Sequence, residues 1–227
     1  MKKILILILS VIVLSSCSNY SKYKKNSIRH HRNVLAQAFK TGDRITAINS
    51  IQNILIYDTA NYELLDTLAN LYIQLDDLRS AFYMGSKMIV LKEDDMHAWE
   101  IYGTMASRLN YSAEALKAFT KLYEKKKNTA YLYEIGVQNV NSGNIDAGIT
   151  VIQSLLTMPQ SITDIYIMRS GPNQYRNVPV ISMAHYFLGS YAELKNENTV
   201  AAGHYANALK FAPDFDLAQL KLNKIRK

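Results

Sequence analysis

The chain has 227 residues, of which 48% are hydrophobic and 20% charged, and its formal net charge is +7. It has a single cysteine, which excludes an internal disulfide and a metal site built from several thiolates. All 19 acidic residues lie from Asp43 onward, together with 18 of the 26 basic residues. A nearly neutral body lacks the basic face that nucleic-acid binding requires, so we expect no nucleic-acid partner.

The first 16 residues have the parts of a secretory signal. Lys2 and Lys3 precede a run from Ile4 to Leu14 that is apolar except at Ser10, and Leu14-Ser15-Ser16-Cys17 follows. This run is shorter than the roughly 20 residues that a transmembrane helix needs. The arrangement resembles a bacterial lipoprotein signal peptide. The resemblance implies that residues 1–16 are removed and that Cys17 is lipidated, with palmitate expected among its acyl chains. Two alternatives are a secreted protein with a chance cysteine and an uncleaved signal anchor.

The segment that follows Cys17 is basic. Lys22, Lys24, Lys25, Arg29 and Arg32 all precede the first acidic residue. Beside an acylated cysteine, such a segment favours anionic lipid head groups. We therefore predict a lipidated basic tether over residues 17–32.

A period of 34 residues runs through the rest of the chain. Ala47, Ala81 and Ala115 follow this spacing, and small residues at such positions let two helices approach closely. The pattern resembles the tetratricopeptide repeat (TPR), whose best-matching residues here are Trp99, Tyr102, Gly103, Ala106, Ala115 and Phe119. The resemblance implies an all-α solenoid of about five helix pairs plus a C-terminal capping helix. We place units 1–4 in residues 33–162, an insert in 163–181, and unit 5 with the capping helix in 182–227.

Polar turn residues separate the expected helices. They are Thr41-Gly42-Asp43, Asp76-Asp77, Asn110 and Ser142-Gly143-Asn144. Acidic residues at such turns commonly cap helix N-termini. We therefore interpret Asp76-Asp77 and Glu93-Asp94-Asp95 as capping segments, and not as metal ligands.

The insert matches neither neighbouring repeat. We expect Ile165 to Met168 to extend the preceding helix, and Ser170-Gly171-Pro172-Asn173 to end it. One hypothesis is a projection that contacts a partner through exposed Arg169, Tyr175 and Arg176. The other hypothesis is a longer linker that changes the orientation of the last repeat.

No catalytic pattern is found in the chain. The histidines are scattered, and neither a zinc-protease spacing nor a glycine-rich phosphate loop occurs. His185 falls on a packing position of the repeat. We expect no enzyme activity, no metal and no cofactor other than the covalent lipid on Cys17.

By resemblance, the concave surface of the repeats binds the partner. The residues expected to line it are Asp66, Asn70, Glu100, Arg108, Tyr133 and Tyr186. A groove of mixed charge with aromatic rings suits a bound peptide or helix.

These features predict a membrane-anchored adaptor that binds another protein of the cell envelope and aids assembly of an envelope complex. Ser18, in the position where aspartate favours inner-membrane retention, points to the outer membrane facing the periplasm of a Gram-negative bacterium. The alternative is an outer-membrane lipoprotein that binds nutrients or glycans. That alternative requires an aromatic-lined pocket near Tyr166 and Tyr175.

Overall fold

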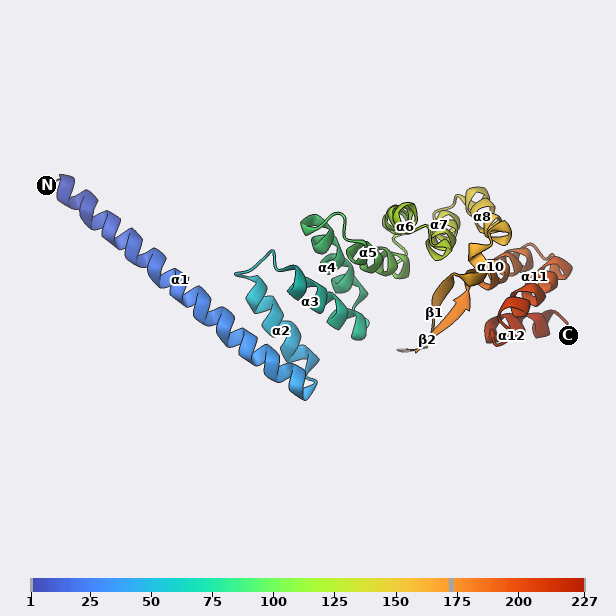
Figure 1. The fold of residues 1–227 in the computed structure, drawn as a ribbon, viewed down its shortest axis with the longest axis horizontal. Helices are drawn as coiled ribbons and strands as arrows, with labels where there is room; N and C mark the ends of the chain where they lie inside the picture. Colours follow the sequence, from blue (N-terminus) through green and yellow to red (C-terminus); the bar gives the residue numbers. More distant parts are fainter. Residues whose placement is uncertain (1, 172–173, 227) are drawn as a thin grey trace. The chain divides into compact units, whose positions relative to one another are not determined.

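The computed structural model describes the backbone of residues 2–171 and 174–226, and the side chains of these residues except those of 2–19 and 170. The chain divides into two compact units, Met1–Leu75 and Asp76–Lys227 (Figure 1). Each unit is described by itself.

The first unit contains α1 (Lys2–Thr41), α2 (Arg44–Leu55) and α3 (Tyr62–Gln74). Gly42 joins α1 to α2 with a φ of 71°, a left-handed conformation that glycine adopts without strain. Helices α1 and α2 pack together and bury Leu35, Ala47 and Ile51. The segment predicted as a tether is therefore helical, because it belongs to α1.

The second unit is a row of paired helices followed by a short helix, α12. Its helices are α4 (Leu78–Leu91), α5 (Met96–Arg108), α6 (Ser112–Lys126), α7 (Thr129–Asn141), α8 (Ile145–Ser154), α9 (Gln160–Thr163), α10 (Val180–Leu194), α11 (Asn198–Phe211) and α12 (Asp216–Ile225). A 3₁₀ turn, η1 (Leu155–Thr157), lies between α8 and α9. This architecture confirms the predicted all-α TPR solenoid.

Small residues set the close approach of α7 and α8. A Cβ atom on Gly148 would lie 2.6 Å from the carbonyl oxygen of Gly136, and one on Gly136 would lie 2.6 Å from Cδ1 of Ile152. A Cβ atom on Gly148 would clash with backbone, and one on Gly136 would require the side chain of Ile152 to move. The two glycines therefore allow the backbones of this pair to touch, as the repeat pattern predicts.

The predicted caps at the helix starts are present. Asp43, Asp77 and Asp95 each accept a hydrogen bond from a backbone N–H in the first turn of α2, α4 and α5. Each carboxylate satisfies a donor that has no partner within its helix. The interpretation of Asp77 and Asp95 as caps is therefore confirmed.

The insert differs from the expected helix. Residues Ile165–Gly171 form β1, which pairs antiparallel with β2 (Gln174–Pro179). The expectation that Ile165 to Met168 extend the preceding helix is wrong. Apolar side chains on both faces of this segment, with β-branched Ile165 and Ile167 on the outer one, favour a strand. Pro172 and Asn173, part of the expected break, lie outside the described residues.

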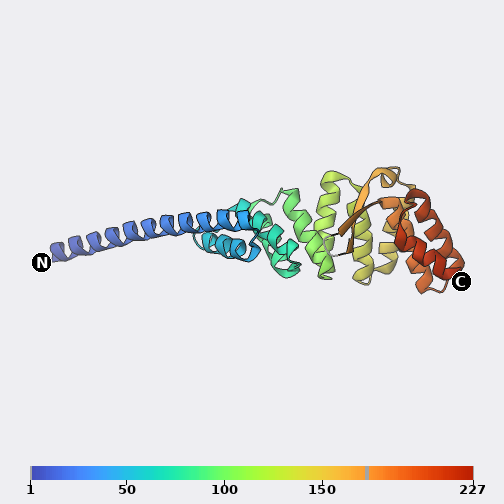
Figure 2. The ribbon, with the colours of Figure 1, turned by 90° about the horizontal axis from the view of Figure 1, so that it is seen from below.

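Figures 1 and 2 show where this hairpin lies within the second unit. It begins beside α10 and extends along the row of helices toward α5. Tyr166 and Val178, which pair across the hairpin, face the helices, with Val178 only 1% exposed. The hairpin is thus packed onto the solenoid.

Candidate functional site

The hairpin is fastened to the N-terminus of α7 at its base. Asp164 accepts hydrogen bonds from the backbone N–H of Thr129 at 2.7 Å and from its hydroxyl at 2.8 Å. The carbonyl oxygen of Asp164 accepts from the N–H of Val180 at 3.0 Å. One residue before β1 therefore caps α7 and also holds the start of α10.

A buried polar cluster fixes the hairpin to the middle of α7. The hydroxyl of Tyr166 donates to Oε1 of Glu134 at 2.5 Å, and Nε2 of Gln138 donates to Oε2 of Glu134 at 3.2 Å. Nε2 of Gln138 also donates to Oγ of Ser107 at 2.8 Å. Burial raises the pKa of Glu134, and the hydrogen bonds from Tyr166, Gln138 and Ser107 partly offset that rise.

The structure contradicts the prediction that Tyr133 lines an open groove. Tyr133 is only 5% exposed, and burial raises the pKa of its hydroxyl. The ring of Tyr166 meets it edge-on at 5.0 Å between centroids, and Phe187 does so at 6.3 Å. Tyr133 is a core residue because the hairpin covers the face of α7 on which it lies.

Tyr186, another predicted groove residue, also packs inside the unit. It is half-buried, and its ring lies 5.8 Å from that of Tyr205 and 5.1 Å from that of Phe215.

The two predicted charged groove residues of α5 have intramolecular partners. Glu100 accepts from Nζ of Lys126 at 2.6 Å and from the hydroxyl of Tyr131. Arg108 forms an ion pair with Asp76. Both side chains are part-exposed, so a partner could contact them. Their ion pairs within the protein hold them in place.

Asp66 and Asn70, the remaining groove candidates, lie on α3 in the first unit. Nδ2 of Asn70 donates to Oδ1 of Asp66 at 3.1 Å, one turn away along the helix. Asn70 is exposed.

The three insert candidates behave differently from one another. Tyr175 is 57% exposed, as predicted. Arg169 lies 3.2 Å from Oδ1 of Asp76, and Arg176 lies 2.9 Å from Oδ2 of Asp216. The hairpin therefore contacts the start of the second unit through one arginine and the α12 region through the other.

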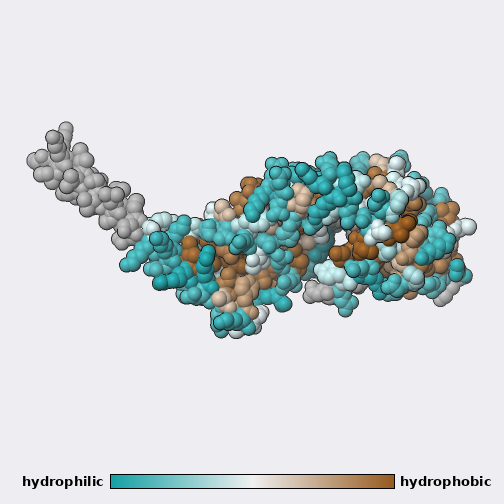
Figure 3. Space-filling view, viewed as in Figure 1, coloured by the Kyte–Doolittle hydropathy of each residue, from teal (hydrophilic) through white to brown (hydrophobic). Residues whose placement is uncertain are grey.

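The outer face of the hairpin is apolar and exposed. Ile165, Ile167 and Tyr175 are 41%, 65% and 57% exposed, and strand alternation places them opposite Tyr166. In Figure 3 hydrophobic colour appears at the hairpin, beside a hollow that separates it from the helices around α5. The sequence analysis did not predict this face. The signal that could have indicated a strand was the β-branched pair Ile165 and Ile167 at alternating positions.

Tyr166 and Tyr175 do not line one pocket. Tyr166 is packed against Tyr133 and Glu134, whereas Tyr175 pairs with Arg169 on the opposite face of the hairpin. The geometry required by the glycan-binding alternative is therefore not formed by these two rings.

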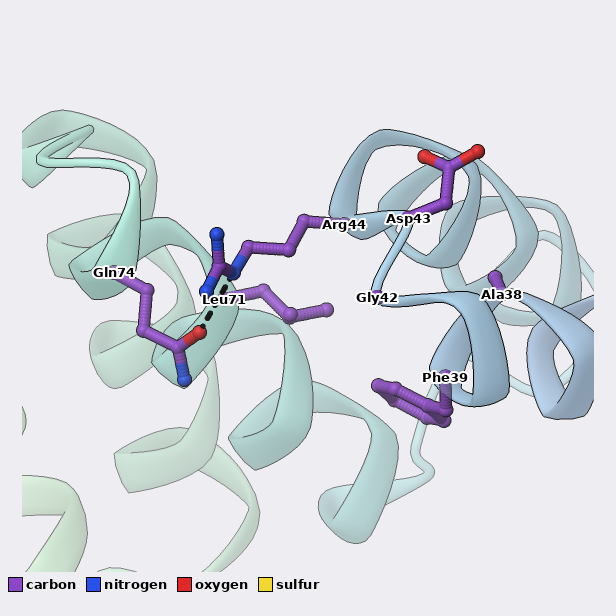
Figure 4. A pocket seen from close by; sticks show the side chains of 7 residues that line it. All are labelled: Ala38, Phe39, Gly42, Asp43, Arg44, Leu71 and Gln74. Carbon is purple, nitrogen blue, oxygen red and sulfur yellow. Dashed lines mark hydrogen bonds between the residues drawn. The ribbon is translucent and has the colours of Figure 1, made fainter.

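Two surface hollows lie elsewhere. One, of about 200 Å³, lies in the first unit, where Phe39 and Leu71 point toward each other beside the hydrogen bond from Nε of Arg44 to Gln74 (Figure 4). The other, of about 280 Å³, lies between α8, α10 and α11 and includes His204. No cluster of three or more potential metal ligands occurs among the described residues.

His204 forms a close pair with His185. Their Nδ1 atoms lie 3.0 Å apart, so one imidazole must be neutral at that atom to accept a hydrogen bond. Burial and the nearby His204 and Lys210 lower the pKa of His185 to about 4. His185 is a half-buried packing residue, in agreement with its repeat position.

Cys17 lies among the residues whose side chains are not described. Among the residues whose side chains the structure describes, no helix is long and apolar enough to cross a membrane. Residues 1–18 match the family model of the prokaryotic membrane lipoprotein lipid attachment site. The chain thus carries a lipoprotein attachment site ahead of its helical repeats.

Solved structures with a similar fold are TPR proteins. A MamA protein shares 18% identity over 82% of this chain and 92% of its own, with a TM-score of 0.60. MamA from Desulfovibrio magneticus RS-1 shares 15% over 84% and 97%, with a TM-score of 0.60. YrrB, described as a TPR protein with an unusual peptide-binding site, shares 15% over 89% and 95%, also with a TM-score of 0.60. Comparison with curated protein sequences gave no match. At these identities, the likeness establishes the TPR fold.

Proposed function

We propose that this protein is a lipid-anchored adaptor that binds another protein of the cell envelope on the outer face of its β-hairpin. Acylated Cys17 holds it at the membrane, and Ser18 favours the outer membrane with the repeats facing the periplasm. The adaptor works by binding alone, with no cofactor beyond its covalent lipid. Such binding would hold the partner beside the membrane while an envelope complex is assembled.

The observation that carries this proposal is the fixed, exposed apolar face of Ile165, Ile167 and Tyr175. Apolar side chains grouped on a surface mark sites of protein interaction more often than single ones do. The hydrogen bonds of Asp164 hold the hairpin at its base, and the ion pairs of Arg169 and Arg176 hold it near its tip, so little ordering entropy is lost on binding. The TPR scaffold itself favours protein binding, and a peptide-binding site is described for the similar protein YrrB.

The expected partner segment is extended and apolar, with an acidic group near the hairpin tip. Arg108 and Arg169 both pair with Asp76, so two guanidinium groups share one carboxylate at that place. A carboxylate on the partner would complement the two guanidinium groups.

Two experiments test the two halves of the proposal. For anchorage, metabolic labelling with a fatty acid should mark the wild type and leave Cys17→Ser unlabelled; equal labelling would refute the anchor.

For binding, Ile167→Asp should abolish capture of the partner from envelope extracts. Val90→Asp, at an exposed valine on α4 (84%), is the matched control and should retain it. Equal capture by all three proteins would refute the hairpin site.

A further inference from the structure

The outer side of α1 carries a line of basic residues. Lys22, Lys25, Arg29 and Arg32 follow the spacing i, i+3, i+7, i+10, which places them along one side of a helix. All four are exposed. We call these four residues the basic stripe.

A neighbouring side of the same helix, about 100° round from the basic stripe, packs on α2. The residues on this packed side are half-buried or buried, and they also have the spacing i, i+3, i+7, i+10: Ile28, His31, Leu35 and Ala38. Lys24 lies toward this packed side and is not part of the basic stripe. The fold of the first unit therefore fixes which charges of the segment point away from the protein.

One acidic residue comes near this part of α1: Asp58 follows Tyr57, whose ring lies 6.4 Å from that of Tyr23, and its carboxylate accepts a hydrogen bond from Asn61. No acidic residue occurs in the sequence before Asp43, and α2 contains none. Asp43 itself caps α2 through Thr46. A row of four exposed cations with so few acidic residues nearby is suited to an anionic surface.

The position of the attachment site identifies that surface. Lys22 follows Cys17 by five residues, which correspond to about 8 Å along a helix. Tyr20 and Tyr23, between Cys17 and the rest of the stripe, are 62% and 63% exposed. Aromatic rings with a polar group are favoured at the membrane–water interface.

We propose that the basic stripe of α1 lies against anionic phospholipid head groups beside the lipid anchor. The inference rests on the proposed anchorage at Cys17. The acyl chains would supply attachment, while the stripe would lay α1 along the membrane surface and set the direction in which α2 and α3 face. Neither the acyl chains nor the basic stripe need bind the membrane strongly alone, because stable anchoring commonly combines a lipid with a second attachment.

The test is vesicle binding by unacylated protein. The mature chain from residue 17 with Cys17→Ser is mixed with vesicles of equal parts phosphatidylglycerol and phosphatidylcholine, or with phosphatidylcholine alone. We expect binding to the anionic vesicles only, weakening as the salt concentration rises. Replacing Lys22, Lys25, Arg29 and Arg32 by Gln should lower the affinity at least about tenfold.

A control with the same change of net charge separates the stripe from overall charge. Arg79, Lys87, Lys125 and Lys210 are exposed basic residues outside α1, and their replacement by Gln should leave vesicle binding unchanged. Circular dichroism and melting temperature verify that both quadruple variants are folded. Equal affinities of the stripe variant and its parent, equal losses in both quadruple variants, or no preference for anionic vesicles would overturn the inference. Since the protein is unacylated, these results are independent of the labelling test at Cys17.

Discussion

Tyr166 on the β-hairpin donates its hydroxyl to the buried carboxyl group of Glu134 on α7, at 2.5 Å. The two residues are 32 positions apart in the sequence. Their contact converts a face of α7 that would be open in a simple repeat array into a covered core.

Replacing Tyr166 with Phe should loosen the hairpin. The ring remains, but Glu134 loses a donor in a buried place, which we expect to cost about 1–3 kcal/mol of unfolding free energy. Trypsin should cleave faster after Arg169 and Arg176. Tyr175→Phe, at the exposed ring on the other face, is the matched control and should change neither stability nor cleavage. Unaltered cleavage of the Tyr166→Phe protein would show that this hydrogen bond does not hold the hairpin.

The stability of the second unit should depend on the ionisation of Glu134. Burial raises its folded-state pKa above the ordinary 4.5, so the folded state holds the proton more tightly than the unfolded state. The contribution of this group is therefore favourable below pH 4.5 and declines as pH rises toward the folded pKa. Thermal melts across this range should show that the stability of the wild type, measured relative to Glu134→Gln, declines as pH rises, because the contributions of other groups are common to both proteins. A decline of the same size in both proteins would assign it to other groups.

The histidine pair should make the fold sensitive to acid. The pKa of His185 is lowered to about 4 from 6.5, first by burial and then by His204 and Lys210, and burial also lowers that of His204. Between these two pKa values the unfolded chain binds more protons than the folded chain does. The free energy of unfolding should therefore fall as pH drops from 6.5 to 4. With the partial exposure of His185 discounted, about 1 kcal/mol is expected. His185→Gln should reduce this loss in pH-dependent melts; a loss as large as that of the wild type would refute the assignment.

Two glycines on neighbouring helix pairs should respond in opposite directions to replacement by alanine. Gly148→Ala places a Cβ 2.6 Å from a backbone oxygen, so we expect a loss of about 1–3 kcal/mol. Gly203 lies within α11 with no atom near the added Cβ, so Gly203→Ala should stabilise by about 0.5–1 kcal/mol. Denaturant unfolding measures both. Similar effects of the two substitutions would contradict the close packing of α7 on α8.

The helix pairs were predictable because their signals are local. Gly42 and Asp43 mark the end of one helix and the start of the next within three residues, and the alanines spaced by 34 residues repeat one packing contact. Both kinds of residue act in the same way wherever the pattern occurs. The helical course of residues 17–32 was not predicted, since a basic segment alone does not show that it continues into α1.

The candidate site was harder to predict because its contacts are long-range. Tyr133 occupies a groove position of the repeat, and no residue near it in the sequence shows that Tyr166 covers it. Arg169 reaches Asp76, which lies 93 positions earlier. Such pairs depend on the docked hairpin, and the hairpin was missed because a short apolar run is ambiguous between helix and strand.

The central claim, that the outer hairpin face binds an envelope protein, is tested most directly by site-specific photocrosslinking in intact cells. A photoreactive residue replaces Ile167 in one strain and Val90 in another, since both side chains are exposed and apolar (65% and 84%). We predict one dominant crosslinked envelope protein from position 167 that is absent from position 90. No crosslink at 167, or the same set of crosslinks at both positions, would contradict the claim.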